Sequence, residues 1–168
     1  VDVVFANSVQ AEVDNAYGRG KARAAQILAE TVRGTGGHFA DLLLPNLFGE
    51  HGRPGYNSFV ATFAHEVAAG RTPTVSGDRE IPLLHAQDAA AAAIAAVGTD
   101  VREVVAGEAI GISRVLELFT EFHARYRERG EVPDISTPMR RNLFNTYRAA
   151  AFPDMWPVSP QVHADNRG

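Results

Sequence analysis

Short apolar runs alternate with helix-patterned segments along this chain, and this alternation restricts its fold more than any other feature. Residues 1–5 (VDVVF) and 39–44 (FADLLL) have the β-branched and leucine-rich character of buried strands. Between them, residues 17–32 carry apolar side chains at helical spacing, with Asp14 or Asn15 available as an N-cap. A strand, a helix and a second strand in this order predict parallel strands joined by a crossover helix.

The same alternation predicts further elements after residue 44. We expect helices at 59–69, 87–97, 113–127 and 139–150, and strands at 74–76, 81–85 and 101–106. The predicted N-caps of the first three of these helices are Asn57 or Ser58, Asp88, and Ser113. Beyond residue 150, recurring prolines predict an irregular segment. The basic pair Arg140 and Arg141 is expected on a solvated surface.

These elements predict an α/β fold, namely part of a doubly wound, Rossmann-like parallel sheet over residues 1–48 and a small α/β region over residues 49–150. Residues 151–168 are predicted to be a linker. A Rossmann sheet normally has a Gly-rich phosphate loop between its first strand and first helix. Neither G-x-G-x-x-G nor G-x-x-G-x-x-G stands in that place here. The N-terminal dinucleotide-binding βαβ units are therefore predicted to be lacking from this sequence.

Composition restricts the classes of partner. A net charge of −4 gives no electrostatic reason to expect nucleic acid or an anionic membrane as a partner. The longest apolar tract, residues 89–97, is too short to span a bilayer. The sequence has no cysteine, which suits a reducing cytoplasm, and its six histidines show no His-x-His or i,i+4 pair. We expect a cytoplasmic protein without a metal site.

The segment NSVQAEVDNAYGRGK (residues 7–21) contains the most compact set of side chains suited to catalysis, Ser8, Tyr17 and Lys21. Tyr17 and Lys21 are four residues apart, so they share one face of a helix. A neighbouring ammonium group stabilises a phenolate, which makes tyrosine usable as a general acid or base near neutral pH. Ser8, at the end of a strand, is expected to hydrogen-bond a substrate carbonyl oxygen. Because Tyr-x-x-x-Lys also arises by chance on many helices, the surrounding sequence has to support this interpretation.

The surrounding sequence contains an Asn-x-Tyr-Gly entry into a helix and a following strand that ends in Pro-Asn-Leu-Phe-Gly. In these features the chain resembles the extended short-chain dehydrogenase/reductase family. NSVQAEVDNAYGRGK, LPNLFGEHGRPGYNSFVATFAHEVA and LFNTYRAAAFPDMWPVSPQVHADNRG together look most like the bifunctional sugar-nucleotide reductases of capsular polysaccharide synthesis, which carry a cupin domain after the reductase domain. The resemblance covers nearly the whole chain. It implies the C-terminal half of a reductase domain, with residues 151–168 leading into the cupin domain.

The resemblance implies NAD(P)-dependent reduction of a 4-keto nucleotide-linked deoxy sugar, with NADPH as the expected reductant. Tyr17 would be the general acid, Ser8 would orient the carbonyl, and Lys21 would stabilise the phenolate and hold the nicotinamide ribose. The implied cofactor contacts are Tyr17, Lys21, Pro45, Asn46 and Leu47.

The same resemblance implies that residues 49–150 bind the substrate. The candidate substrate contacts are Gln10, Asn46, His51, Arg53 and Asn57. His51 and Arg53 lie in a loop rich in Gly and Pro, which is a usual place for ligand contacts. Asn57, at a helix start, would approach the diphosphate. Ile81 stands where many relatives have an arginine.

Two other functions stay open at this point. One is a sugar-nucleotide epimerase or dehydratase of the same family, and the other is a non-catalytic truncated remnant that acts as an assembly module. The resemblance also implies a homodimer for the intact protein. Because the cofactor site is incomplete, we expect the 168-residue chain to bind NAD(P)H weakly or not at all.

Overall fold

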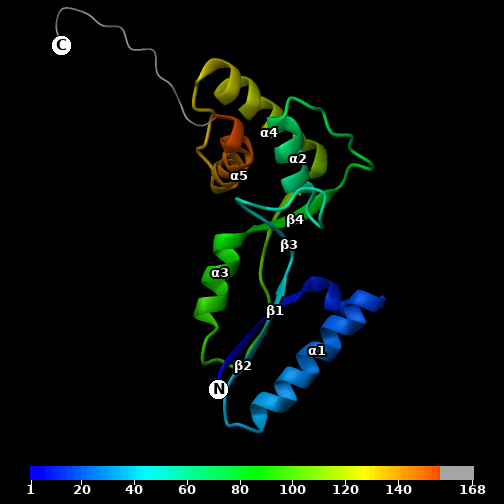
Figure 1. Ribbon diagram of the computed structural model, residues 1–168. Helices are drawn as coiled ribbons and strands as arrows, with labels where there is room; N and C mark the ends of the chain where they lie inside the picture. Colours follow the sequence, from blue (N-terminus) through cyan, green and yellow to red (C-terminus); the bar gives the residue numbers. More distant parts are fainter. Residues whose placement is uncertain (156–168) are drawn as a thin grey trace, which may run out of the picture.

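Sheet A forms the lower half of the molecule in this computed structural model, which describes residues 1–155 (Figure 1). It consists of β1 (Val3–Ser8), β2 (Phe39–Leu44) and β5 (Arg102–Val104), in the order β1-β2-β5. Both pairs of strands are parallel. The predicted parallel α/β class is therefore confirmed, and strand 39–44 has the expected bounds.

Helices lie on both faces of sheet A (Figure 1). α1 (Ala16–Arg33) covers one face, and α3 (Ala86–Ala95) covers the other. Asn15, one of the two predicted caps, begins α1 by accepting a hydrogen bond from the Gly18 N–H at 2.7 Å. The side of sheet A that faces α3 forms a small apolar core with Ala40, Leu42, Leu44, Leu84, Ala89 and Ala96. The other side carries polar residues.

Pro45 separates sheet A from a second sheet. Proline has no N–H to donate to a strand ladder, so β2 ends there and the chain enters β3 (Asn46–Phe48) in sheet B. In sheet B, β4 (Glu80–His85) pairs parallel with β3 and antiparallel with β6 (Glu108–Gly111). The backbone between Leu44 and Asn46 therefore connects the two halves of the molecule.

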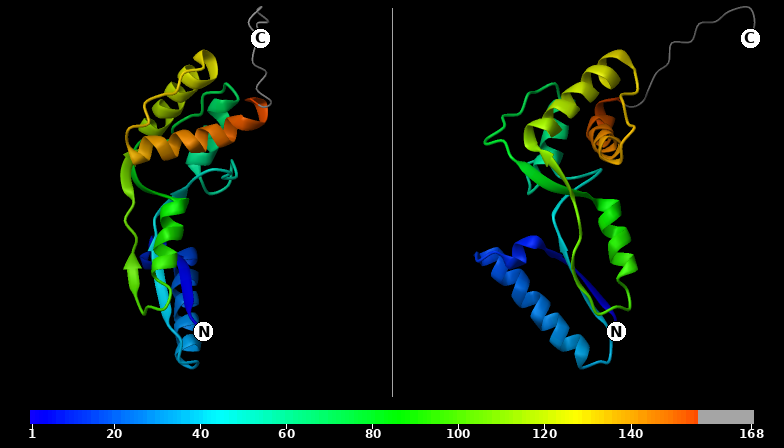
Figure 2. Two further views of the ribbon diagram at one scale, coloured as in Figure 1. Left: turned by 90° about the vertical axis from the view of Figure 1, so that its left-hand side faces the viewer. Right: turned by 180° about the vertical axis from the view of Figure 1, so that it is seen from behind.

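Three helices enclose the main core at the end of the molecule opposite α1 (Figure 2). They are α2 (Phe59–Ala68), α4 (Ile112–Phe122) and α5 (Pro138–Met155). A π-helical segment, η2 (His123–Glu128), continues α4. The buried members of this core include Phe48, Val60, Phe63, Leu83, Val115, Phe119, Phe122, Leu143, Phe144 and Tyr147. Within residues 1–155, no helix combines the length and apolar character needed to cross a bilayer.

The predicted strand at residues 74–76 is wrong. Residues 74–76 form no strand, and Val75 packs partly buried against the main core instead. β6 was not predicted, and it forms through its antiparallel pairing with β4. β5 is shorter than the predicted 101–106.

Of the three predicted helix starts, that of α2 is confirmed, and those of α3 and α4 need correction. Ser58 caps α2, with its Oγ accepting from the Ala61 N–H at 3.2 Å, and Asn57 precedes it. Asp88 lies in the first turn of α3, whose N-cap position is His85. Ser113 lies inside α4, because Gly111 is the N-cap and Asp78 Oδ1 accepts from the Ser113 N–H at 3.0 Å. That backbone hydrogen bond lowers the pKa of Asp78 below its usual value.

The C-terminal prediction was wrong over residues 151–155, which form the last turns of α5. Ala151 is buried there. Residues 156–168 of the predicted linker lie outside the described residues. Arg140 is not solvated either, because its guanidinium pairs with Glu121 at 2.8 Å and Asp134 at 3.3 Å, whereas Arg141 is exposed as predicted.

Candidate active site

Ser8 lies where β1 ends and a short 3-10 helix, η1 (Val9–Glu12), begins. Its Oγ accepts a hydrogen bond from the Gln10 N–H at 3.2 Å and so caps η1. Its own N–H donates to the side-chain Oδ1 of Asn7 at 2.8 Å. The acceptor role of the Ser8 oxygen is thus used within the chain, and the hydroxyl hydrogen stays available for another acceptor.

Tyr17 occupies the first turn of α1, and its side chain is 54% exposed. The next residue, Gly18, is buried against η1, where any Cβ would collide with the carbonyl oxygens of Gln10 and Val13. Only glycine permits such a close approach of two backbones. Gly18 therefore sets the distance between the helix that carries Tyr17 and the segment that follows Ser8.

Lys21 reaches back to β1. Its Nζ donates to the carbonyl oxygen of Ala6 at 3.3 Å and lies 4.9 Å from the centroid of the Phe5 ring. Because Tyr17 is one helical turn away on the same face, α1 presents both side chains at the carboxyl end of β1. Among residues 1–155, no hydrogen bond joins Ser8, Tyr17 and Lys21 directly, so their arrangement is set by η1, Gly18 and Ala6.

Three predicted cofactor residues lie at the transition between the sheets. Pro45 is buried, whereas Asn46 and Leu47 are exposed. Asn46 Nδ2 makes a long hydrogen bond to the carbonyl of Pro82, at 3.5 Å. They follow the carboxyl end of β2, which is parallel to β1 and in register with it, so Ser8 pairs with Leu44. Both segments therefore meet at the same edge of sheet A.

The predicted substrate residues are divided between two places. Gln10 lies in η1 beside Ser8. Arg53 is exposed, and its guanidinium lies 5.6 Å from the Tyr56 ring centroid. His51 and Asn57 have left-handed backbones, with φ of 63° and 51°, which few residues other than glycine adopt. These two conformations shape the loop that follows β3.

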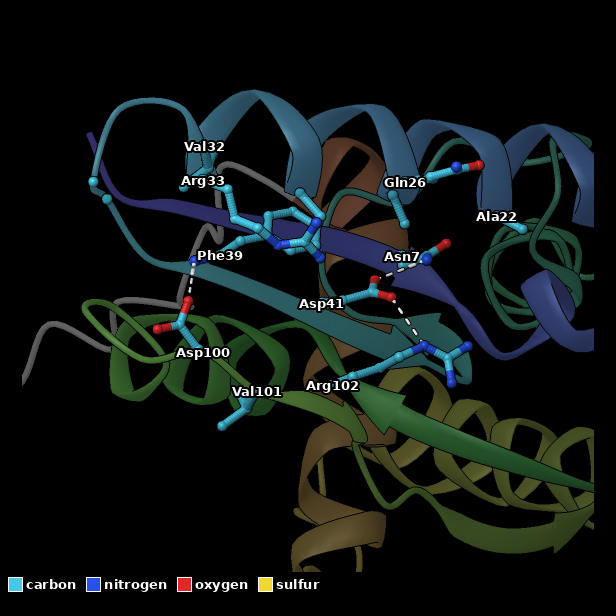
Figure 3. A pocket seen from close by; sticks show the side chains of 14 residues that line it. Asn7, Ala22, Gln26, Val32, Arg33, Phe39, Asp41, Asp100, Val101 and Arg102 are labelled. Atoms are coloured by element: carbon cyan, nitrogen blue, oxygen red, sulfur yellow. Dashed lines mark hydrogen bonds and ion pairs between the residues drawn. The ribbon is translucent and has the colours of Figure 1, made fainter.

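A cavity of about 760 Å³ lies between α1 and sheet A (Figure 3). Its floor carries a chain of polar contacts, in which Asn7 Nδ2 donates to Asp41 Oδ1 at 2.8 Å and Arg102 Nε donates to Asp41 Oδ2 at 3.2 Å. At the other end, Asp100 Oδ1 accepts from the Phe39 N–H at 3.0 Å. None of these residues was among the predicted site residues, although an aspartate inside the apolar run FADLLL was a usable signal.

A second cavity of about 580 Å³ is lined by Glu50, His51, Tyr126, Asn145, Arg148, Ala149, Phe152 and Met155. Glu50 pairs at 3.1 Å with Nε2 of His85, which is buried and lies edge-on to Phe48. None of the residues that line this cavity lines the cavity between α1 and sheet A, and Ser8, Tyr17 and Lys21 line neither of the two. His51 is thus placed with α5 and η2. No group of three or more His, Cys, Asp or Glu side chains suited to a metal ion occurs within residues 1–155.

Comparison with protein families matches residues 7–112 to the NAD dependent epimerase/dehydratase family. The chain belongs to this family. The matched range includes Ser8, Tyr17 and Lys21, together with the loop after β3.

A relative from Pseudomonas aeruginosa, described as UDP-2-acetamido-2,6-beta-L-arabino-hexul-4-ose reductase, is 27% identical over 174 residues. The match covers 100% of this chain and 46% of the relative. The solved structure of the capsular polysaccharide assembling protein CapF from Staphylococcus aureus matches with a TM-score of 0.80 at 27% identity, covering 98% of this chain and 46% of that one. The chain thus spans about half the length of these family members.

The UDP-N-acetylglucosamine 4-epimerase from Methanobrevibacter ruminantium M1, solved with UDP-N-acetylmuramic acid, has a TM-score of 0.72 at 16% identity. The match covers 91% of this chain and 63% of the epimerase. At this identity the similarity shows a common fold. The fold is thus shared with an epimerase that was solved in complex with UDP-N-acetylmuramic acid.

Proposed function

We propose that the protein carrying this chain uses NAD(P)H to reduce the 4-keto group of a nucleotide-linked deoxy sugar, in the synthesis of a surface polysaccharide precursor. This chain would supply the proton-transfer and substrate-binding half of the site. The family membership and the similarity to a sugar-nucleotide reductase support the proposal. The observation that carries it is the placement of Tyr17 and Lys21, on the first two turns of α1, at the carboxyl end of the strand that carries Ser8.

Reduction of a ketone adds a hydride to carbon and a proton to oxygen. NAD(P)H supplies the hydride when it is bound. The Tyr17 hydroxyl donates the proton, and the Lys21 ammonium group stabilises the phenolate that remains. Ser8 donates its hydroxyl hydrogen to the same carbonyl oxygen, which is compatible with its acceptance of the Gln10 N–H.

Part of a nicotinamide site fits the residues of this chain. Leu47 is a 41% exposed apolar side chain directly after the carboxyl end of β2, and the parallel register brings this edge beside Ser8. We propose that Pro45, Asn46 and Leu47 hold the nicotinamide ring, with Lys21 and Tyr17 on its ribose. Ligands of open α/β sheets bind at this edge of the strands. No Gly-rich loop for the pyrophosphate stands between β1 and α1.

For the substrate, we propose contacts from Gln10, Asn46, His51, Arg53 and Asn57. Arg53 is an exposed cation in the loop after β3, which suits a diphosphate. Gln10 is directly beside Ser8 and suits the sugar. His51 lines the cavity next to α5, so of these five residues it has the weakest support for a contact with the reacting sugar.

The test is Tyr17→Phe in the complete protein, assayed by NADPH oxidation with UDP-2-acetamido-2,6-beta-L-arabino-hexul-4-ose, the keto sugar in the relative's description. We expect kcat to fall by about 100-fold or more, since a general acid is lost, while NADPH affinity stays nearly unchanged. Tyr126→Phe, which removes a hydroxyl far along the chain in η2, is the control and should turn over normally. Unchanged turnover by Tyr17→Phe would remove Tyr17 from the mechanism.

An epimerase is the second candidate, because the matched family includes epimerases and dehydratases. The two reactions differ in their cofactor balance. A reductase consumes NAD(P)H in proportion to the sugar converted, whereas an epimerase regenerates its cofactor in each turnover. Conversion of a nucleotide sugar without net NAD(P)H oxidation would therefore favour the epimerase.

A further inference from the structure

A polar chain of Asn7, Asp41 and Arg102 crosses sheet A (Figure 3), and Ser8 directly follows Asn7 in β1. Asn7 is 4% exposed and Asp41 is 3% exposed. The Asn7 amide makes two contacts, because its Oδ1 accepts the Ser8 N–H and its Nδ2 donates to Asp41 Oδ1, each at 2.8 Å. The side chain of Asn7 therefore connects the backbone of Ser8 to the neighbouring strand β2.

The polar contacts continue from Asp41 to Arg102 on the third strand, β5, and from Arg102 to the helix that follows Ser8. Arg102, on β5, donates from Nε to Asp41 Oδ2 at 3.2 Å, and its Nη1 pairs with Glu12 at 3.2 Å. Glu12 is the last residue of η1, the helix that Ser8 caps. Ser8 thus lies between two segments that contact the same carboxylate. Asn7, which precedes it, donates to Asp41, and η1, which follows it, is joined to Asp41 through Glu12 and Arg102.

The same segment also holds Tyr17. The carbonyl oxygens of Gln10 and Val13, in η1 and directly after it, lie against Gly18, the residue next to Tyr17. A shift of η1 therefore moves the first turn of α1 relative to Ser8. Through η1, the polar chain therefore acts on the positions of both Ser8 and Tyr17.

Stability alone does not account for these polar residues. Burying a carboxylate has a desolvation cost, and an apolar pair of similar volume is often equally or more stable. The rest of β2 is apolar apart from Asp41. The hydrogen bonds of the polar chain fix the orientation of the Asn7 side chain, and through it the orientation of the Ser8 backbone.

We propose that Asn7, Asp41 and Arg102 are positioning residues, which hold Ser8 and the first turn of α1 in the arrangement needed for protonation of the substrate carbonyl. This inference rests on the proposed reduction. Asn7 acts on Ser8 directly, Asp41 orients Asn7, and Arg102 couples both to η1.

A double-mutant cycle in the complete protein tests the proposal, with turnover of the same keto sugar nucleotide as the readout. We expect Asn7→Ala and Ser8→Ala each to lower kcat by about 10- to 100-fold, because misplacement of a reacting group by about 1 Å has this effect. If Asn7 acts through Ser8, the double variant is no slower than Ser8→Ala alone. A purely structural role predicts that the two losses multiply, and that result would overturn the inference.

Asp100→Asn is the matched control. Asp100 borders the same cavity and accepts hydrogen bonds, but it lies at the opposite end of β2. Both Asn7→Ala and Asp100→Asn are expected to lower the urea midpoint, and only Asn7→Ala to lower kcat. An equal loss of kcat in Asp100→Asn would contradict the positioning role.

Arg102→Ala gives an independent variant if Asn7→Ala fails to fold, because the Arg102 side chain is 56% exposed. It is expected to lower kcat with the same dependence on Ser8 and to leave NADPH affinity unchanged. Arg102→Ala with normal kcat would exclude Arg102 from the positioning set. If Ser8→Ala itself turns over normally, the proposed role of Ser8 in the reduction fails. This result is distinct from a failure of the positioning role, in which Ser8→Ala is slow but its loss multiplies with that of Asn7→Ala.

Discussion

At the scale of single residues, two glycines of the same helix have opposite roles. A Cβ on Gly18 would collide with backbone oxygens of Gln10 and Val13, whereas a Cβ on Gly20 would meet nothing within 4 Å. We predict that Gly18→Ala destabilises the protein by about 1–3 kcal/mol through overpacking and also lowers kcat. Gly20→Ala should stabilise it by about 0.4–1 kcal/mol, because alanine restricts the unfolded chain.

Urea unfolding and turnover of both variants check this pair. Gly20→Ala controls for the change in helix propensity, since both positions are in α1 and receive the same substitution. A Gly18→Ala variant as stable and active as Gly20→Ala would show that α1 and η1 are not in close contact in solution.

The sequence shows the residues of the candidate reactive set, but it does not show the contacts that hold them in place. The spacing of Tyr17 and Lys21 and the position of Ser8 after a strand were visible in the sequence, because both follow from local periodicity. The contacts of Asp41 were not, since they join three strands far apart in the chain. The only indication in the sequence was Asp41 itself, a charged residue among the apolar residues of β2.

At the scale of elements, the local sequence pattern predicted α1 and β2 well. It failed for segments whose structure depends on pairing with another strand or on packing against the core. β6 forms through its antiparallel pairing with β4, whereas residues 74–76 pair with no strand, and neither result follows from the local sequence. α5 was underestimated because prolines after residue 150 indicated a break, while burial of Ala151 against the main core favours a longer helix.

The contact of α5 with η2 gives a prediction on pH. Burial raises the pKa of Tyr147 to about 12, and the Tyr147 hydroxyl lies 3.0 Å from Nδ1 of His123. An unfolded tyrosine titrates near about 10. The folded protein therefore keeps this proton where the unfolded chain loses it, so the contribution to stability is complete below about pH 10 and is lost as pH rises toward about 12.

We expect the urea midpoint of the wild type to fall more steeply between about pH 10 and about pH 12 than that of Tyr147→Phe, which has no proton to lose. Tyr56→Phe is the control, because its ring is exposed in the loop after β3, and it should keep the wild-type slope. Equal slopes for the wild type and Tyr147→Phe would mean that Tyr147 is accessible to water in solution.

At the scale of the whole molecule, the arrangement places the candidate site at an open side of the fold. β1, which carries Ser8, is the edge strand of sheet A within the described residues, so one side of its ladder has no partner there. The chain also spans 46% of the Pseudomonas aeruginosa relative. That this chain holds the proton-transfer part of a larger site stays a prediction.

The 168-residue chain is therefore predicted not to bind NAD(P)H with micromolar affinity. Dinucleotide sites of Rossmann sheets hold the pyrophosphate on the N–H groups of a Gly-rich loop and a helix N-terminus, and no such loop stands between β1 and α1. The proposed contacts of Tyr17, Lys21 and Leu47 reach only the nicotinamide end. Fluorescence titration of the chain with NADPH checks this, with the complete protein as the positive control. A micromolar Kd for the chain alone would mean that its own residues bind the pyrophosphate, and Arg102→Ala and Arg33→Ala would then show whether the cavity beside α1 is the place.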